Sequence, residues 1–187
     1  EYEFNLTLAN EILDKAGYTK RDADGTRLTK DGKRRLDWTL WVQNAFPLEF
    51  RMADQVKEWY NQVGVKLTVK GIESSAENAM TYPAPGVGGA YDMEVWNWNG
   101  APDPDFVLSI YTTDQIGINN ECAWSNSTYD ELYLLQKKEM DPDKRQEIIW
   151  KMQEIYHDAA INNIMYFLPF TAAYRTDKFE GFFPKYG

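Results

Sequence analysis

Apolar and polar positions alternate with two different periods in the first hundred residues of the chain. In residues 36–43, 65–70 and 91–98 apolar and polar residues alternate, so that side chains of one kind recur at every second position. This alternation is typical of β-strands. Residues 47–63 instead carry apolar side chains three or four positions apart. These side chains would line one buried face of a helix: Phe50, Ala53, Val56, Tyr60 and Val63. Strand, helix and strand in this order predict a parallel βαβ unit.

A short helix and two tight turns are predicted before this unit. The helix lies within residues 6–18, where Gly17 is expected to terminate it as a C-cap. Leu8, Ile12 and Ala16 are expected on its apolar face. Asp-Gly pairs at 24–25 and 31–32 then predict a short ribbon or loop. After the βαβ unit, residues 73–80 favour a short helix that leads to the strand predicted at 91–98. The N-terminal half therefore predicts an α/β fold.

Helical patterns dominate the second half of the chain. Capping residues mark three helix starts: Asp103 before residues 104–111, Ser127 with Asp130 for residues 127–140, and Asp141 before residues 142–160. The last helix has a clear apolar stripe: Ile148, Ile149, Met152, Ile155, Tyr156 and Ala159. Residues 163–175 predict a closing strand. The expected architecture is α/β, with a mainly parallel sheet flanked by helices.

Two indole rings end the strand predicted at 91–98. By the alternation, Trp96 and Trp98 point to the same side at its carboxyl end, and a polar loop follows at 99–104. Ligands of open α/β sheets bind at such strand ends, and indole rings beside amides suit a sugar or a peptide. The candidate ligand-binding residues are Trp96, Trp98, Asn99, Asp103, Asn119, Asn120 and Trp124.

The aromatic residues also have a packing interpretation. Aromatic residues make up 15% of the chain, so indole rings could serve as core filler. We expect packing roles for Trp38, Trp59 and Trp150, which fall on strand or helix faces. For Trp98 and Trp124 both a ligand contact and a domain interface stay open.

Charge and residue counts exclude several classes of function. The net charge of −9 leaves no basic stripe for phosphates, so we expect no nucleic-acid partner. One Cys (Cys122) and one His (His157) are too few for a zinc site. The sequence 22–25 is similar to the start of a calcium loop, but Arg27 falls where an oxygen ligand is needed. Because phosphate loops and nucleophile elbows are also absent, we expect no catalytic residue, metal or cofactor.

Five stretches of the chain, in a fixed order, carry a family resemblance. They are residues 9–28, 61–73, 91–108 (YDMEVWNWNGAPDPDFVL), 126–170 and 173–182. Together they resemble the second lobe of the family 5 extracellular solute-binding proteins, the peptide-, nickel- and oligosaccharide-binding components of ABC importers.

The resemblance implies a periplasmic-binding-protein-like (type II) lobe over residues 1–187. In that family two lobes close on a ligand, so the chain, which has no initiating Met, is expected to be a fragment without its first lobe. The implied partners are a small solute (a peptide or an oligosaccharide), that first lobe and ABC permease subunits. The implied location is extracytoplasmic, in the periplasm or at the outer face of the membrane, where a lipid anchor would hold the protein.

The resemblance also bears on the ligand. Peptide-binding relatives carry a pocket Trp at the position of Trp98 and, a few residues later, an Asp that pairs with the peptide amine. Here Gly100 and Ala101 occupy that neighbourhood, and the nearest acid is Asp103. This departure leaves room for an uncharged ligand such as an oligosaccharide. Two alternatives from other classes stay open: a sugar-active enzyme that uses Asp103 or Asp105, and an interaction module whose aromatic residues meet a partner.

Overall fold

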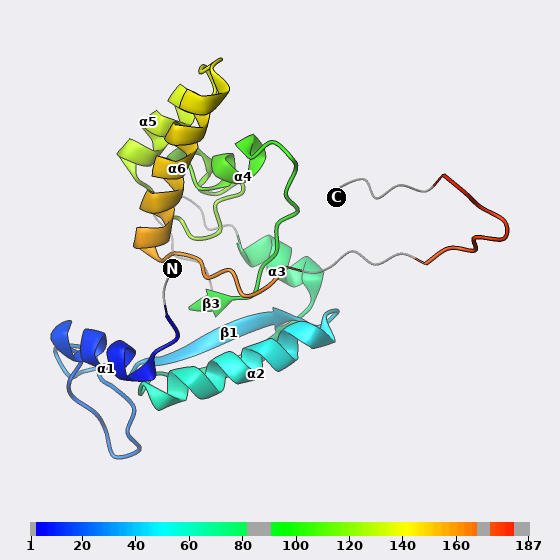
Figure 1. Cartoon of the computed structure of the whole chain (residues 1–187). Helices are drawn as coiled ribbons and strands as arrows, with labels where there is room; N and C mark the ends of the chain where they lie inside the picture. Colours follow the sequence, from blue (N-terminus) through cyan, green and yellow to red (C-terminus); the bar gives the residue numbers. More distant parts are fainter. Residues whose placement is uncertain (1–2, 82–90, 168–172, 182–187) are drawn as a thin grey trace.

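The described residues contain a parallel sheet and a group of helices (Figure 1). The computed structural model describes residues 3–81, 91–167 and 173–181. Within these ranges three strands pair in the order β2-β1-β3, with β1 at Asp37–Gln43, β2 at Lys66–Ile72 and β3 at Met93–Glu94. Both pairings are parallel, as the sequence predicts.

The first βαβ unit has the predicted form. Helix α2 (Pro47–Gln62) connects β1 to β2, which pair in register from Asp37 with Lys66 to Gln43 with Ile72. The buried side chains between the helix and the strands form the first core cluster: Leu36, Leu40, Val42, Ala53, Val63, Val65 and Leu67. The expected helix face, with Phe50, Val56 and Tyr60 packed against this cluster, is confirmed.

Strand β3 is much shorter than the alternation of residues 91–98 predicts. Only Met93 and Glu94 pair with β1, opposite Leu40 and Trp41, and the Val95 amide then donates to the Trp41 carbonyl at 2.9 Å. Strand β1 continues with Val42 and Gln43, but β3 does not pair with these two residues, and the contact between the strands ends at the Val95 amide. Residues 96–98 therefore lie outside the paired part of the sheet and not on a strand face.

Helix α1 (Leu6–Lys15) buries a different face from the one predicted. Leu6, Ala9 and Leu13 pack against the first core cluster, while Leu8 and Ile12 remain 44% and 56% exposed. A buried polar anchor, described next, explains the rotation of the helix. The end of the helix is as predicted, because Gly17 follows it with a φ of +94°.

Arg27 is the buried anchor that fixes α1 to the sheet unit. Its guanidinium group is 1% exposed and donates to Val63 O at 2.7 Å, Asn10 Oδ1 at 2.8 Å and Asp14 Oδ1 at 2.5 Å. Asn10 and Asp14 are four residues apart, so they turn one side of α1 toward Arg27. A buried charge requires such partners, and this requirement outweighs the burial of Leu8 and Ile12.

The helices of the second half surround a second core cluster. Helix α3 follows β2, and a short 3-10 helix interrupts the loop after α4. The bounds are α3 Ser74–Thr81, α4 Asp105–Ile110, η1 Thr113–Gln115, α5 Ser127–Gln136 and α6 Pro142–Ala159. The buried members of the second cluster are Leu108, Ile110, Tyr111, Tyr129 and Met152. Figure 1 shows α4, α5 and α6 as a group on the far side of β3 from α2.

The predicted helix caps are partly correct. Asp141 caps α6 by accepting from the amides of Asp143 and Lys144, as expected. Asn126 caps α5 in place of Ser127, because its side chain one residue earlier accepts from the Tyr129 amide. The cap residue of α4 is Pro104, so the prediction of Asp103 is wrong by one position, although the Asp103 carboxylate accepts from the Asp105 amide at 2.8 Å.

Two further expectations concern the ribbon and the closing strand. Short antiparallel bridges join Arg21 to Arg27 and Leu28 to Arg35, which confirms the ribbon between the Asp-Gly turns. The strand predicted at 163–175 is wrong for residues 163–167 and 173–175, which have no strand structure, and residues 168–172 lie outside the described ranges. In the stripe of α6, Ala159 is exposed, contrary to the prediction. No helix in the described ranges is long and apolar enough to cross a membrane.

Gly64 is expected to tolerate alanine less well than Gly25. Both have left-handed φ values, +82° and +88°, so alanine at either position should cost about 1–2 kcal/mol of the free energy of unfolding. At Gly64 the new Cβ would also lie 2.1 Å from Arg21 Nη1 and 2.9 Å from Arg27 Cγ, whereas at Gly25 nothing lies within 4 Å. Urea unfolding of both variants measures the difference, and equal losses would contradict the packing of Arg27.

Candidate functional site

Three aromatic rings lie together where the chain leaves β3. The centroid of the Trp98 ring is 6.1 Å from that of Trp96 and 5.8 Å from that of Phe106, both in edge-to-face contact. Trp96 and Trp98 are half-buried, and Phe106 on α4 is 44% exposed. We call these three residues the aromatic shelf. The chain runs from β3 to α4 in Figure 1, so the shelf joins the sheet to the helical group.

Glu121 lies beneath the shelf and is 5% exposed. Its Oε1 accepts a hydrogen bond from Trp98 Nε1 at 3.3 Å and one from the Tyr111 hydroxyl group at 3.1 Å. Burial raises the pKa of the Glu121 carboxyl group, and the hydrogen bonds from Trp98 and Tyr111 only partly oppose this shift. The shelf is therefore supported by a carboxyl group that is costly to ionise.

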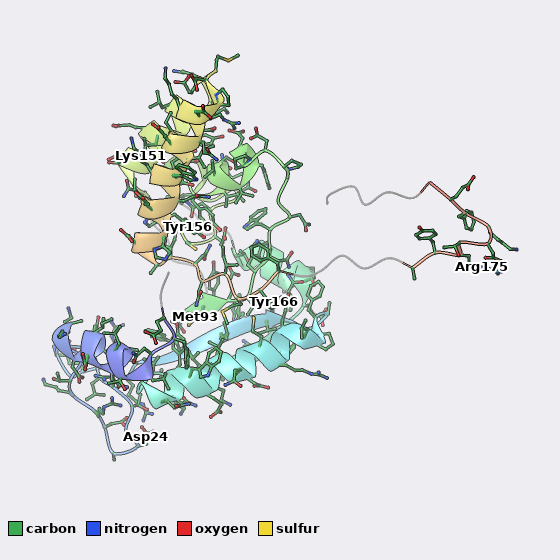
Figure 2. The ribbon with its side chains drawn as sticks, viewed as in Figure 1. Asp24, Met93, Lys151, Tyr156, Tyr166 and Arg175 are labelled. Atoms are coloured by element: carbon green, nitrogen blue, oxygen red, sulfur yellow. The ribbon has the colours of Figure 1, made fainter. Side chains whose placement is uncertain are left out.

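Tyrosine residues hold the segment around Glu121. The Tyr91 hydroxyl group lies 2.7 Å from Glu121 O and 2.9 Å from Thr81 O, so it links the end of α3 to this segment. The Tyr111 ring packs 4.7 Å from the ring of Tyr156 on α6. Figure 2 labels Tyr156 and Met93, which mark the helical group and the sheet on either side of this segment. Burial raises the pKa of both Tyr91 and Tyr111, and the negative charges of nearby acids add to the shift.

Asp103, a predicted ligand-binding residue, is bound by Arg145 of α6. The two oxygen atoms of its carboxylate accept from Nη1 and Nη2 at 2.8 and 2.9 Å, a bidentate geometry. Gln136, which is fully buried, donates to Asp105 Oδ1 at 2.8 Å and accepts from Arg145 Nε at 3.0 Å. The hydrogen bonds from Arg145 and the Asp105 amide lower the pKa of Asp103 to about 2. Asp103 thus anchors the loop that follows the shelf.

The predicted asparagine residues lie in different surroundings. Asn120 is fully buried, donates to Thr112 O and Trp124 O, and accepts from the Trp124 amide. Asn119 is half-buried and donates to Gln115 Oε1 at 2.9 Å. Asn99 is exposed in the loop after the shelf. Asn120 therefore shapes the loop, while Asn99 presents its amide to solvent.

Trp124 joins the second core cluster. Its ring meets that of Tyr129 edge-to-face at 5.2 Å. Of the seven predicted site residues, the structure brings Trp96 and Trp98 into contact and places Trp98 and Trp124 against the same core cluster. Whether each residue contacts a ligand stays a prediction.

Sequence reasoning missed Glu121, Phe106 and Arg145. Glu121 stands in a polar, irregular stretch, where periodicity carries no information about burial. Phe106 and Arg145 fall on helices, and their roles depend on how those helices meet the loop at 99–104. The position of Glu121 next to Asn120 in the sequence was a weak indication of a role in the site. Only the fold shows that its carboxyl group reaches Trp98.

The described residues also bear on metal and thiol chemistry. No group of three or more His, Cys, Asp or Glu side chains that could hold a metal ion occurs in these parts of the chain. Cys122 Sγ lies 3.3 Å from Asn162 Oδ1, and His157 Nδ1 lies 3.4 Å from Asp158 Oδ1.

Comparisons with known proteins agree on one family. Residues 1–119 match the description "Bacterial extracellular solute-binding proteins, family 5 Middle". The di/tripeptide-binding protein 3 of Pseudomonas aeruginosa is 29% identical over 156 residues, which are 81% of this chain and 26% of that protein. The chain thus spans about a quarter of the length of the curated relatives it matches.

Solved structures share the fold. The oligopeptide-binding protein AppA of Bacillus subtilis, solved with a nonapeptide, has a TM-score of 0.72 and 24% identity over 83% of this chain and 30% of its own. A mannohexaose-bound oligopeptide-binding protein of Thermotoga maritima has the same TM-score at 18% identity, over 82% of this chain and 29% of its own. These neighbours are periplasmic binding proteins, so the chain has the expected type II fold.

Replacement of Arg145 by glutamine is expected to raise the pKa of Asp103 from about 2 toward the ordinary value of 3.8. Because the pKa of Asp103 is lowered in the fold, the stabilisation by this pair is present above about pH 4 and is lost as the pH falls toward 2. An NMR titration of the carboxyl carbons follows Asp103 directly. Arg175→Gln, which removes the exposed partner of Asp177, is the control and should leave the Asp103 midpoint unchanged.

Proposed function

The chain belongs to the bacterial extracellular solute-binding proteins of family 5, and on that premise we propose that it forms one lobe of a protein that captures a solute for an ABC importer. The observation that carries the proposal is the aromatic shelf at the carboxyl end of the parallel sheet. Ligands of open α/β sheets bind there, and half-buried indole rings supply apolar contact area at a small cost in conformational entropy.

A short peptide is the proposed solute. The matching relatives in Pseudomonas aeruginosa are named di/tripeptide-binding proteins, and AppA was solved with a nonapeptide. Trp96, Trp98 and Phe106 would pack against the side chains and the flat amide groups of such a ligand. The exposed Asn99 would offer its side-chain amide to the peptide backbone.

Capture would occur by closure of two lobes. The relatives are about three times as long as this chain, and the remaining length would supply a first lobe that covers the shelf from the other side. A solute that contacts both lobes stabilises the closed form by the free energy of the contacts made only in that form. Permease subunits would then recognise the closed protein, outside the cytoplasm, where a lipid anchor would keep it near the membrane.

An oligosaccharide is the second candidate solute, and the Asp103–Arg145 pair favours it. Asp103, the first acid after Trp98 in the sequence, is held bidentately by a guanidinium group, so its charge is neutralised and it is a poor partner for a peptide amine. A sugar ring needs no such carboxylate and stacks on indole rings. The neighbour from Thermotoga maritima was solved with mannohexaose bound.

The same contacts weigh against the alternative of a sugar-active enzyme. Asp103 is bound by Arg145, and Asp105 accepts from the buried Gln136. Two carboxyl groups engaged in this way are poorly placed for acid and base roles in glycoside cleavage. The interaction-module alternative differs from the proposal in predicting no response of the shelf to small solutes.

The indole N–H signals of Trp96 and Trp98 should shift when a solute that fits the shelf is added. We expect saturable shifts with either di- and tripeptides or cello- and mannooligosaccharides, with a Kd near the millimolar range because one lobe supplies only part of the contacts. Two-dimensional ¹H–¹⁵N NMR of this chain detects such weak binding.

A matched pair of variants controls this titration. Trp98→Leu should weaken binding about tenfold or more, because it removes the central ring of the shelf. Trp150→Leu removes an indole ring that is 54% exposed on α6 and should leave binding unchanged. If no member of the panel moves the Trp96 and Trp98 signals at about 10 mM, the shelf is not a solute site.

A further inference from the structure

We propose that Glu121 is the positioning residue of the aromatic shelf, and that its carboxyl group holds the Trp98 ring in the orientation that contacts the solute. The proposal rests on the proposed function for the identity of the shelf as a solute site. It adds a residue that does not contact the solute and acts through the indole N–H group of Trp98.

The contacts of Trp98 show why a positioning residue is needed. Its contacts with Trp96 and Phe106 are edge-to-face, at 6.1 and 5.8 Å between ring centroids. Such contacts favour an angle between the rings but leave the direction of the indole N–H group open. The hydrogen bond from Trp98 Nε1 to Glu121 Oε1, at 3.3 Å, has a direction and selects one orientation of the ring.

Glu121 can perform this task because it is itself held from both ends. Its Oε1 also accepts from the Tyr111 hydroxyl group, which accepts in turn from Asn162 Nδ2 at 2.6 Å. Its backbone carbonyl lies 2.7 Å from the Tyr91 hydroxyl group. A chain of hydrogen bonds thus runs from the segment that follows α6, through Tyr111 and Glu121, to the shelf.

The charge of Glu121 should control the strength of the hydrogen bond from Trp98 Nε1 to its carboxyl group. The groups that donate hydrogen bonds to its carboxyl group, Trp98 and Tyr111, are neutral. The titratable groups that face it are acidic or weakly acidic: Tyr91, Glu94, Tyr111, Cys122 and Tyr156. An ionised carboxylate accepts hydrogen bonds more strongly than a protonated one, so the indole ring is held more firmly when Glu121 is charged.

Protonation should therefore change binding and stability in opposite directions. Burial raises the pKa of Glu121, so the folded chain binds a proton more readily than the unfolded chain does. The contribution of Glu121 to stability thus increases as the pH falls through this raised pKa. Solute affinity should decrease over the same interval, because the hold on Trp98 weakens. A carboxyl group with a purely structural role would change stability without changing solute affinity.

Glu121→Gln tests the proposal, with Glu49→Gln as the matched control. Glutamine keeps an acceptor oxygen but cannot ionise, so at pH 7 the variant should bind about fivefold more weakly while its stability is unchanged or increased. Glu49 on α2 is also buried, at 6% exposed, and burial also raises its pKa, but the indole N–H group of Trp98 donates to Glu121 and not to Glu49. Its replacement should leave affinity unchanged.

The first readout needs no solute. In the free chain the Trp98 Nε1–H signal should titrate with the Glu121 carboxyl group, and this titration should be absent in Glu121→Gln and retained in Glu49→Gln. The second readout is the affinity for trialanine and for cellotriose between pH 4 and 8, in which only the wild-type chain and Glu49→Gln should lose affinity toward low pH. Trp98→Phe removes the indole N–H group through which Glu121 acts, so adding Glu121→Gln to Trp98→Phe should cause no further loss of affinity.

The outcomes separate this proposal from the proposed function. If the indole signal titrates as described but neither probe binds at any pH, the positioning contact stands and the solute site fails. If a probe binds and Glu121→Gln matches wild type in affinity, pH profile and Trp98 signal, the positioning role is overturned. Glu121→Ala confirms that the contact exists, because it leaves the indole N–H and the Tyr111 hydroxyl group without their acceptor and should lower stability below that of Glu121→Gln.

Discussion

Backbone pairing between β1 and β3 extends over Leu40 with Met93 and Trp41 with Glu94, and β1 ends two residues later. This limit determines where the shelf lies. The pairing stops before β1 does, and the chain leaves the sheet after Val95, which carries Trp96 and Trp98 beyond the paired part of β3. A longer pairing would have kept both indole rings on a strand face, where a helix could cover them. The position of the candidate site is therefore a consequence of the short pairing between β1 and β3.

Three polar anchors hold the segments that the short sheet cannot hold. Arg27 binds α1 and the end of α2, Arg145 binds the loop after the shelf through Asp103, and Glu121 binds Trp98 and Tyr111. Arg27 and Glu121 are buried, so the loss of one partner leaves a polar group without compensation. Asp103 and Arg145 lie closer to solvent, and their bidentate geometry contributes more to orientation than to stability. Each of these three residues joins a loop to a helix or strand by hydrogen bonds.

The sequence predicted the elements with strong periodicity. Helix α2, its buried face, the parallel pairing of β1 with β2, and the cap of α6 at Asp141 follow from local pattern, since packing and local preference agree there. The family and its fold followed from five ordered stretches, whose combination is more specific than any one of them. The pattern of apolar and polar residues gave a wrong prediction where contacts between residues far apart in the sequence determine the structure. The buried face of α1 depends on Arg27, and β3 ends after Glu94 although the alternation continues to Trp98.

The candidate site was predictable only in part for the same reason. Trp96 and Trp98 are identified by their place after a strand, a property of local sequence. The carboxyl group beneath them comes from residue 121, which reaches the shelf only because α4 and the loop after it fold back over β3. Asp103 was chosen for its proximity in sequence, and the structure instead pairs it with a residue of α6 that lies 42 positions away. Contacts across such separations are fixed by tertiary packing and leave little trace in periodicity.

The central claim is that the solute contacts the shelf in the orientation that Glu121 gives to Trp98. Intermolecular nuclear Overhauser effects between a bound solute and the indole protons of this chain test it most directly. The account predicts contacts from the solute to the Trp98 and Phe106 ring protons, with the Trp98 N–H proton still directed at Glu121. Contacts confined to another surface, such as the shallow hollow around Trp150 and His157 on α6, would contradict it.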